Sequence, residues 1–178
     1  DVYKRQDLMF DKNLLKGKRI LVTGGGSGLG KEMSRHFLTY GAEVIICGRR
    51  DEVLQKTATE LADETKGNIS AHSLDIRDSL AIEETINNIF DEGPLDGLVN
   101  NAAGNFISRT NDLSPNGFNA IASIVFHGTF NMTNTVGKKW IELNKPGTIL
   151  SITTTWVWTG SPFVVPSAMS KSGINAMT

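Results

Sequence analysis

The sequence predicts an α/β protein with a doubly wound parallel sheet, that is, a sheet with helices on both faces. Two observations support this fold class. From residue 18 onward, short apolar runs alternate with amphipathic stretches, and strand–helix–strand repeats of this kind join parallel strands through right-handed crossovers. The first run also ends in a glycine-rich turn, TGGGSGLG. Because ligands of such sheets bind beyond the carboxyl ends of the strands, functional residues are expected directly after each strand.

Five apolar runs are expected to form the strands. KRILVTG and EVIICG have the short, uninterrupted pattern of buried strands, whereas NISAHSLD is less apolar. In chain order, the runs are residues 18–24, 43–48, 68–75, 95–103 and 147–154.

The stretches between the strands carry helix signals. Leu29, Met33 and Phe37 recur at helical spacing, and Gly41 supplies a stop. Asp51 is expected to cap a second helix that runs through the early 60s. An apolar stripe marks a third helix and consists of Ile82, Ile86, Ile89 and Phe90.

Two prolines mark later helix starts. Ser114 and Pro115 form a good N-cap and first-turn pair for a long helix. Pro166 opens the last helix.

Composition argues against several classes of function. The 18 basic and 19 acidic residues nearly balance, so bulk charge supports neither nucleic acid nor a membrane surface as a partner. The single cysteine, Cys47, excludes an intrachain disulfide framework and a cysteine-rich metal site, and it fits a reducing compartment. No apolar run approaches the length of a membrane span. The sequence therefore predicts one cytoplasmic domain without a metal.

The glycine-rich turn has the composition of a phosphate-binding loop. Gly24 suits a tight turn, Gly28 a close approach of backbone to a pyrophosphate, and Gly30 the packing of helix on strand. The pattern Thr-Gly-x-x-x-Gly-x-Gly departs from G-x-G-x-x-G, and glycine-rich turns also serve purely as turns. Its place between a strand and an amphipathic helix favours phosphate binding. The expected contacts are Gly24, Gly25, Gly26, Ser27, Gly28, Leu29 and Gly30.

The end of the second strand predicts the choice of cofactor. An acidic residue here would bind the adenosine ribose hydroxyls of NAD, but Gly48 occupies that place, and Arg49 and Arg50 follow it. A guanidinium can bind a 2′-phosphate through two parallel hydrogen bonds. The alternative is a pair of solvated surface arginines. Because this loop must lie beside the ribose, the sequence predicts NADPH.

Three motifs in this order resemble the short-chain dehydrogenase/reductase family: TGGGSGLG, NNAAG at 100–104, and S-x-x-x-K at 167–171. The resemblance covers residues 17–178 and implies a Rossmann-type domain. Within the family, NNAAGNFIS, LSPNGF and SITTTWVWTGSPFVVPSAMSK resemble the 2,4-dienoyl-CoA reductases. Those enzymes use NADPH to reduce the conjugated thioester of an unsaturated fatty acyl-CoA.

Both ends of the chain look artificial. Residues 1–6, DVYKRQ, lack an initiator methionine, and their back-translation resembles a sequencing adapter, so we expect an adapter-derived or disordered leader and a domain over 7–178. KSGINAMT ends within a helical pattern, which predicts a C-terminally truncated fragment that lacks its last strands. Such a fragment is expected to fold poorly. The resemblance implies a homo-tetramer for the full-length protein.

The resemblance also assigns residues to the cofactor. Asp75 and Ile76 match the adenine-binding pair, and Asn101 and Ala102 lie within the NNAAG motif. The alternative for Asp75 is a simple turn acid.

Ser167 and Lys171 match the end of the cofactor site where the nicotinamide lies. Most of the wider family has a tyrosine at the position of Ser167, but the dienoyl-CoA reductases resemble this chain in having a serine. It is expected to hydrogen-bond the cofactor, with helix capping as its alternative role. Lys171 lies one turn later on the same face. It is expected to bridge the nicotinamide ribose hydroxyls and to add positive charge where an oxyanion develops, rather than to be an exposed structural lysine.

Further matches concern the acyl-CoA substrate. Asn105 matches the family's asparagine donor to the thioester oxygen, and Arg77, Phe106 and Ser114 match acyl-CoA contacts. Thr154 is placed to hydrogen-bond the substrate. The alternative interpretations are a core aromatic for Phe106 and a surface charge for Arg77.

The tyrosine acid of the dienoyl-CoA reductases is missing. It lies in a segment resembling ITT-x-Tyr, where this chain has Trp156, and the only tyrosines are Tyr3 and Tyr40, neither of which is expected to reach the site. Ketone reduction needs an acid for the alkoxide, whereas hydride addition to a conjugated thioester makes an enolate that mainly needs hydrogen-bond donors. Asn105 and the indole N–H of Trp156 offer such donors.

His127 is a candidate proton relay. It lies where the wider family often has an asparagine that holds a water chain to the lysine, and an imidazole can both accept and donate a proton near neutral pH. A packing residue is the alternative. Taken together, the sequence predicts NADPH-dependent reduction of a dienoyl-CoA. The alternatives are a general short-chain carbonyl reductase and a non-catalytic NADPH-binding scaffold.

Overall fold

All strands of the sheet run parallel to one another. The computed structural model describes residues 10–178, in which five strands form one sheet in the order β3-β2-β1-β4-β5. They are β1 Arg19–Thr23, β2 Glu43–Gly48, β3 Ile69–Ser73, β4 Gly97–Asn100 and β5 Thr148–Ser151. Each lies within one predicted apolar run, which confirms the predicted fold class. The predicted leader, residues 1–6, and Tyr3 lie outside the described residues.

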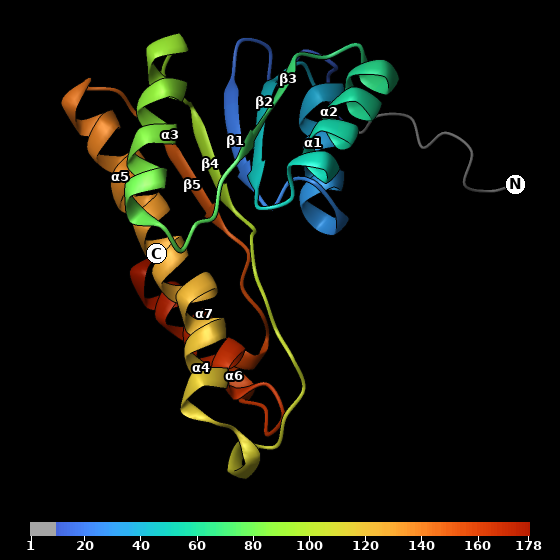
Figure 1. The fold of residues 1–178 in the computed structure, drawn as a ribbon. Coiled ribbons are helices and arrows are strands. Elements are labelled where there is room, and N and C mark those ends of the chain that lie inside the picture. The colour runs from blue at the N-terminus through green and yellow to red at the C-terminus, as the bar shows by residue number, and fades with distance from the viewer. Residues whose placement is uncertain (1–9) are drawn as a thin grey trace, which may run out of the picture.

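Two pairs of helices cover the sheet, one pair on each face (Figure 1). One face packs against α1 and α2, and the other packs against α3 and α5. These helices are α1 Gly28–Thr39, α2 Asp51–Thr65, α3 Ser79–Glu92 and α5 Thr129–Glu142.

A lobe of helices lies beyond the carboxyl ends of β4 and β5 (Figure 1). One long helix joins this lobe to the sheet, because α4 continues through a π-helical segment, η2, into α5. The elements of the lobe are the short 3₁₀ turn η1 Thr110–Asp112, α4 Pro115–Ala122, η2 Ser123–Gly128, α6 Trp156–Thr159 and α7 Val165–Met177.

The apolar runs fill the core on both faces of the sheet. On β1, Leu21 packs toward α3 and α5, while Ile20 and Val22 pack toward α1 and α2. Strands buried on both faces read as continuous apolar runs for this reason. The predicted stripe on α3 is confirmed, since its three isoleucines are fully buried: Ile82, Ile86 and Ile89.

The helix ends test the local predictions. Ser114 caps α4 as predicted, because its Oγ accepts a hydrogen bond from the Gly117 N–H at 3.1 Å. Gly41 has a φ of +91°, the left-handed geometry of a helix stop. The capping role of Asp51 was wrong by one position: α2 begins at Asp51, and Arg50 occupies the cap without a side-chain hydrogen bond.

The long helix is positioned by a close contact at its π-helical segment. A Cβ on Gly128 would lie 2.7 Å from the Ile76 side chain, so the helix approaches the loop after β3 only because residue 128 is glycine. Ile76 is thereby held at the carboxyl edge of the sheet, and the π-helical segment borders the same edge. Segments of this kind are frequent at functional sites.

Candidate functional site

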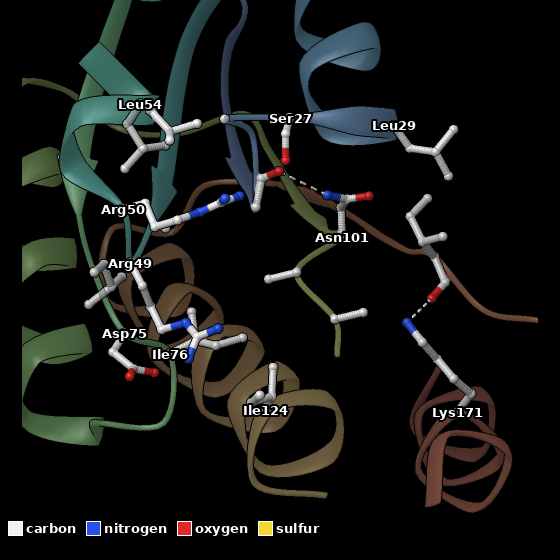
Figure 2. A pocket seen from close by; sticks show the side chains of 18 of the residues that line it. Ser27, Leu29, Arg49, Arg50, Leu54, Asp75, Ile76, Asn101, Ile124 and Lys171 are labelled. Carbon is white, nitrogen blue, oxygen red and sulfur yellow. Dashed lines mark hydrogen bonds between the residues drawn. The ribbon is translucent and has the colours of Figure 1, made fainter. Parts of the chain in front are cut away.

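A cavity of about 480 Å³ lies at the carboxyl ends of the strands, where the strand order reverses beside β1. Figure 2 shows the glycine-rich turn on one side, Arg49 and Asp75 on a second and Lys171 opposite them. The cavity therefore joins segments that are far apart in the sequence. The predicted cofactor residues that line it are Gly24, Gly26, Ser27, Leu29, Arg49, Arg50, Asp75, Ile76, Asn101, Ala102 and Lys171.

Four predicted cofactor residues do not line the cavity: Gly25, Gly28, Gly30 and Ser167. Ser167 is buried, and its alternative role as a helix cap was wrong, because α7 begins two residues earlier and Val164 occupies the cap. It stays on the same helix as Lys171, one turn earlier.

Several lining residues carry no functional signal in the sequence. They are apolar or small and read as ordinary core positions, as Leu54 does with 2 % exposure. For most of them the only available signal was their place just after a strand or in the first turn of a helix, and Ile124, in the middle of the long helix, had no such signal. These residues are Val53, Leu54, Leu74, Ala103, Ile124 and Ile152.

The glycine-rich turn has the shape of a phosphate cradle. Gly24 has a φ of +67°, and a Cβ there would lie 3.0 Å from the Ala102 Cα. A Cβ on Gly30 would clash with the Gly24 carbonyl oxygen, whereas the space in front of Gly28 is open to 4 Å. The cap residue of α1, Ser27, forms no side-chain capping bond. The first N–H groups of α1 are thus available to an anion, so these residues fit a cofactor pyrophosphate.

The NNAAG motif holds this turn in place. Thr23 Oγ1 accepts hydrogen bonds from the backbone N–H groups of Asn101 at 3.0 Å and Ala102 at 2.9 Å. Asn101 Nδ2 donates to the Thr23 carbonyl oxygen at 2.9 Å. The ends of β1 and β4 are therefore joined beside the cavity.

One corner of the cavity carries opposite charges. Arg49 and Arg50 are exposed, and neither forms an ion pair with another described residue. Asp75 pairs instead with Arg77, whose Nε lies 2.9 Å from Oδ2 and 3.0 Å from Oδ1. The hydrogen bond from Arg77 is the main reason that the pKa of Asp75 is lowered. Arg77, predicted to contact acyl-CoA, does not line this cavity.

Lys171 occupies the opposite side. Its side chain is buried, and its Nζ donates a hydrogen bond to the Ile152 carbonyl oxygen at the end of β5. Burial lowers the pKa of this ammonium. A desolvated positive charge therefore faces the cavity where Thr153 also lines the wall.

The predicted substrate residues lie outside the cavity, in and around the lobe. Asn105 Oδ1 accepts a hydrogen bond from the Phe106 N–H at 3.0 Å. Trp156 begins α6, is 36 % exposed, and none of residues 10–178 accepts a hydrogen bond from its indole N–H. Ser114 caps α4, and Thr154 precedes α6. Their roles toward a substrate stay predictions.

Two hydrogen bonds join the halves of the lobe. Ser108 N–H donates to the Phe163 carbonyl oxygen at 3.0 Å, and Thr110 Oγ1 donates to the Pro162 carbonyl oxygen at 2.9 Å. The loop that carries Asn105 is thus tied to the segment just before α7.

Two further side chains lie away from the cavity. His127 is exposed, with its ring edge-to-face against Phe126 at 5.4 Å, and the π-helical segment lines the cavity through Ile124 instead. Its relay role stays a prediction. Tyr40 follows the last residue of α1. A helix of 12 residues is about 18 Å long, so Tyr40 is remote from the glycine turn at the other end.

Comparison with known proteins agrees with this geometry. A family model described as short chain dehydrogenase matches residues 18–178. The chain belongs to the short chain dehydrogenase family. This short chain dehydrogenase is 45 % identical over 167 residues to "Probable 2,4-dienoyl-CoA reductase 3" of Caenorhabditis elegans, a match that covers 92 % of the chain and 54 % of the relative. It is 34 % identical over 181 residues to the "Peroxisomal 2,4-dienoyl-CoA reductase" of Arabidopsis thaliana, covering 97 % and 60 %.

A solved short chain dehydrogenase from Bacillus anthracis shares the fold, with a TM-score of 0.86 and 41 % identity over 90 % of this chain and 67 % of that one. The family resemblance seen in the sequence is confirmed. This short chain dehydrogenase spans about half the length of the curated worm relative, 54 %. Among residues 10–178, no helix combines the length and the apolar character needed to cross a membrane. The same range holds no cluster of three or more metal-ligating His, Cys, Asp or Glu side chains.

Proposed function

We propose that this chain is the cofactor-binding part of a reductase that uses NADPH to reduce a conjugated enoyl thioester, 2,4-dienoyl-CoA above all. The observation that carries the proposal is a single cavity with a glycine cradle at one side, two arginines at a second that form no ion pair within residues 10–178, and a buried lysine opposite. The likeness to two proteins named 2,4-dienoyl-CoA reductase supports the substrate class.

Each part of the cavity suits one part of the cofactor. The amino end of α1, at Ser27, would hold the pyrophosphate. Arg49 and Arg50 would bind the 2′-phosphate, Asp75 would face the adenine, and Lys171 would bind the nicotinamide ribose. When bound, the cofactor supplies the hydride.

The side chains of the protein would stabilise the negative charge on the thioester oxygen. Asn105 and Trp156 are the proposed hydrogen-bond donors, and Lys171 adds positive charge nearby. One such donor is worth ~3–4 kcal/mol in the transition state. Arg77, Phe106, Ser114 and Thr154 are the remaining acyl-CoA contacts of the proposal, and His127 is its proton relay.

The missing phenol separates this reaction from carbonyl reduction. Tyr40 lies at the far end of α1, and no tyrosine among residues 10–178 lines the cavity. An alkoxide would therefore lack a tyrosine acid, whereas an enolate does not need one to form. A non-catalytic NADPH-binding scaffold is the second candidate, because Trp156 lies outside the cavity.

Rapid mixing of the purified full-length protein with NADPH and 2,4-dienoyl-CoA tests the proposal. Loss of NADPH absorbance with the dienoyl-CoA, and not with the saturated acyl-CoA of equal length, is the expected result. NADPH binding without oxidation would instead support the scaffold, and oxidation with ketones would support a carbonyl reductase. A cytoplasmic homo-tetramer is the proposed form of the full-length protein. Light scattering would test the tetramer. Imaging would test the compartment, since the Arabidopsis relative is named peroxisomal.

A further inference from the structure

One corner of the cavity holds a carboxylate among arginines. Of the described residues, Asp75 is the only acidic one that lines the cavity; Arg49 lies beside it, and Arg50 extends toward the glycine-rich turn (Figure 2). A carboxylate at this place is unfavourable for a phosphate ligand, because like charges repel. Its charge must be compensated if the corner is to accept an anion.

The compensation comes from Arg77, which lies outside the lining. Both carboxylate oxygens of Asp75 are engaged: Oδ1 accepts from Arg77 N at 3.1 Å and from Nε at 3.0 Å, and Oδ2 accepts from Nε at 2.9 Å and from Nη2 at 2.5 Å. Such a fork-shaped pair fixes the plane of the carboxylate. Both oxygens of Asp75 are thereby engaged by Arg77, whereas no hydrogen bond among residues 10–178 joins Asp75 to Arg49.

Arg49 is a competing partner for the same carboxylate. Its positive charge is close enough to contribute to the lowered pKa of Asp75, although its contribution is smaller than that of Arg77. Figure 2 shows the Arg49 side chain extending over the cavity beside Asp75. Arg49 forms no ion pair with any of residues 10–178, so the pair with Arg77 leaves its guanidinium unengaged.

We propose that Arg77 determines the preference for NADPH over NADH. Its ion pair with the Asp75 carboxylate leaves the Arg49 guanidinium free to bind the 2′-phosphate. Arg77 is thus a positioning residue that acts through Asp75 and Arg49. This inference rests on the proposed cofactor site. Without Arg77, the Asp75 carboxylate would pair with Arg49, and the phosphate would lose a ligand and gain a repulsive neighbour.

The test measures the dissociation constants of NADPH and NADH by nicotinamide fluorescence, and takes their ratio so that effects common to both cofactors cancel. Arg77→Met is expected to lower the preference for NADPH about three- to fivefold, the scale of one exposed ion pair. Arg77→Lys keeps a positive charge beside Asp75 and is expected to keep the preference within about twofold. In Asp75→Asn/Arg77→Met the competing carboxylate is gone, so the preference is expected to return to the wild-type value.

Three outcomes would overturn the inference. An unchanged preference in Arg77→Met would show that Asp75 does not capture Arg49. A reduced preference that the added Asp75→Asn change fails to restore would show that Arg77 binds the phosphate directly. A wild-type protein that prefers NADH would contradict the proposed cofactor as well, whereas the first two results leave it standing. Because Arg77 is exposed, circular dichroism should show the native fold in every variant.

Discussion

Replacing Lys171 with methionine should separate catalysis from folding. The lysine side chain is buried, its ammonium donates to the Ile152 carbonyl oxygen, and burial lowers its pKa. Methionine keeps the unbranched shape and removes the charge. The lost charge-assisted hydrogen bond is worth about 1.5–3 kcal/mol, but the several kcal/mol that burial costs the ammonium are also relieved. We expect the free energy of unfolding to change by less than about 1.5 kcal/mol, which corresponds to a Tm shift within about 5 °C.

Turnover should respond far more strongly. If Lys171 stabilises charge that grows during hydride transfer, its loss lowers both kcat and kcat/KM, by about 100-fold. Rapid mixing with NADPH and 2,4-dienoyl-CoA gives the rates, and circular dichroism gives the Tm of the same preparations. A change confined to the KM for NADPH would show a binding role only. A fall in Tm of more than about 10 °C alongside the lost turnover would show that Lys171 is structural.

The pH dependence of the wild type gives an independent check on Lys171. Burial lowers its pKa from the ordinary value of 10.5, so the folded protein loses this proton before the unfolded chain does. Turnover should therefore fall as pH rises through the lowered pKa. Between the two pKa values the unfolded state binds more protons, so this group makes the folded state more stable as pH rises. Lys171→Met should show neither effect, and an identical alkaline profile in the variant would refute the assignment.

Three other experiments test Arg49, Trp156 and the buried Cys47. Arg49→Ala should raise the NADPH dissociation constant about tenfold or more, since each charge-assisted bond to the phosphate is worth ~1.5–3 kcal/mol. The NADH dissociation constant should barely change. Equal losses of affinity for both cofactors would indicate a structural role for Arg49. Trp156→Phe should lower kcat about 100-fold if the indole N–H is an oxyanion donor, while Trp156→Tyr should retain or improve dienoyl-CoA reduction; a Phe variant with wild-type turnover would end the donor proposal. Burial raises the pKa of Cys47 to about 12, so a thiol reagent should label the native protein only after unfolding, and prompt labelling would contradict the described core.

The local signals in the sequence were enough to predict the elements that surround the cavity. EVIICG matches β2, Glu43–Gly48, residue for residue, because a strand buried on both faces needs an uninterrupted apolar run. The glycine-rich turn could be predicted for a similar reason. Its positive φ angles and close backbone contacts exclude side chains, so these positions must be glycine, and glycine is visible in the sequence. The cap at Ser114 likewise depends only on its own first turn.

Only the tertiary structure decided which side chains meet at the site. The sequence matched Arg77 to a substrate contact, but the fold pairs it with Asp75 beside Arg49. Ile124 reads as a core position, yet it lines the cavity, and Trp156 lies outside it. A periodic pattern or a motif indicates which residues lie on the same helix or strand and on the same face of it. What that face touches depends on how the loops after β3, β4 and β5 pack together, and such contacts between distant segments leave no periodic trace in the chain.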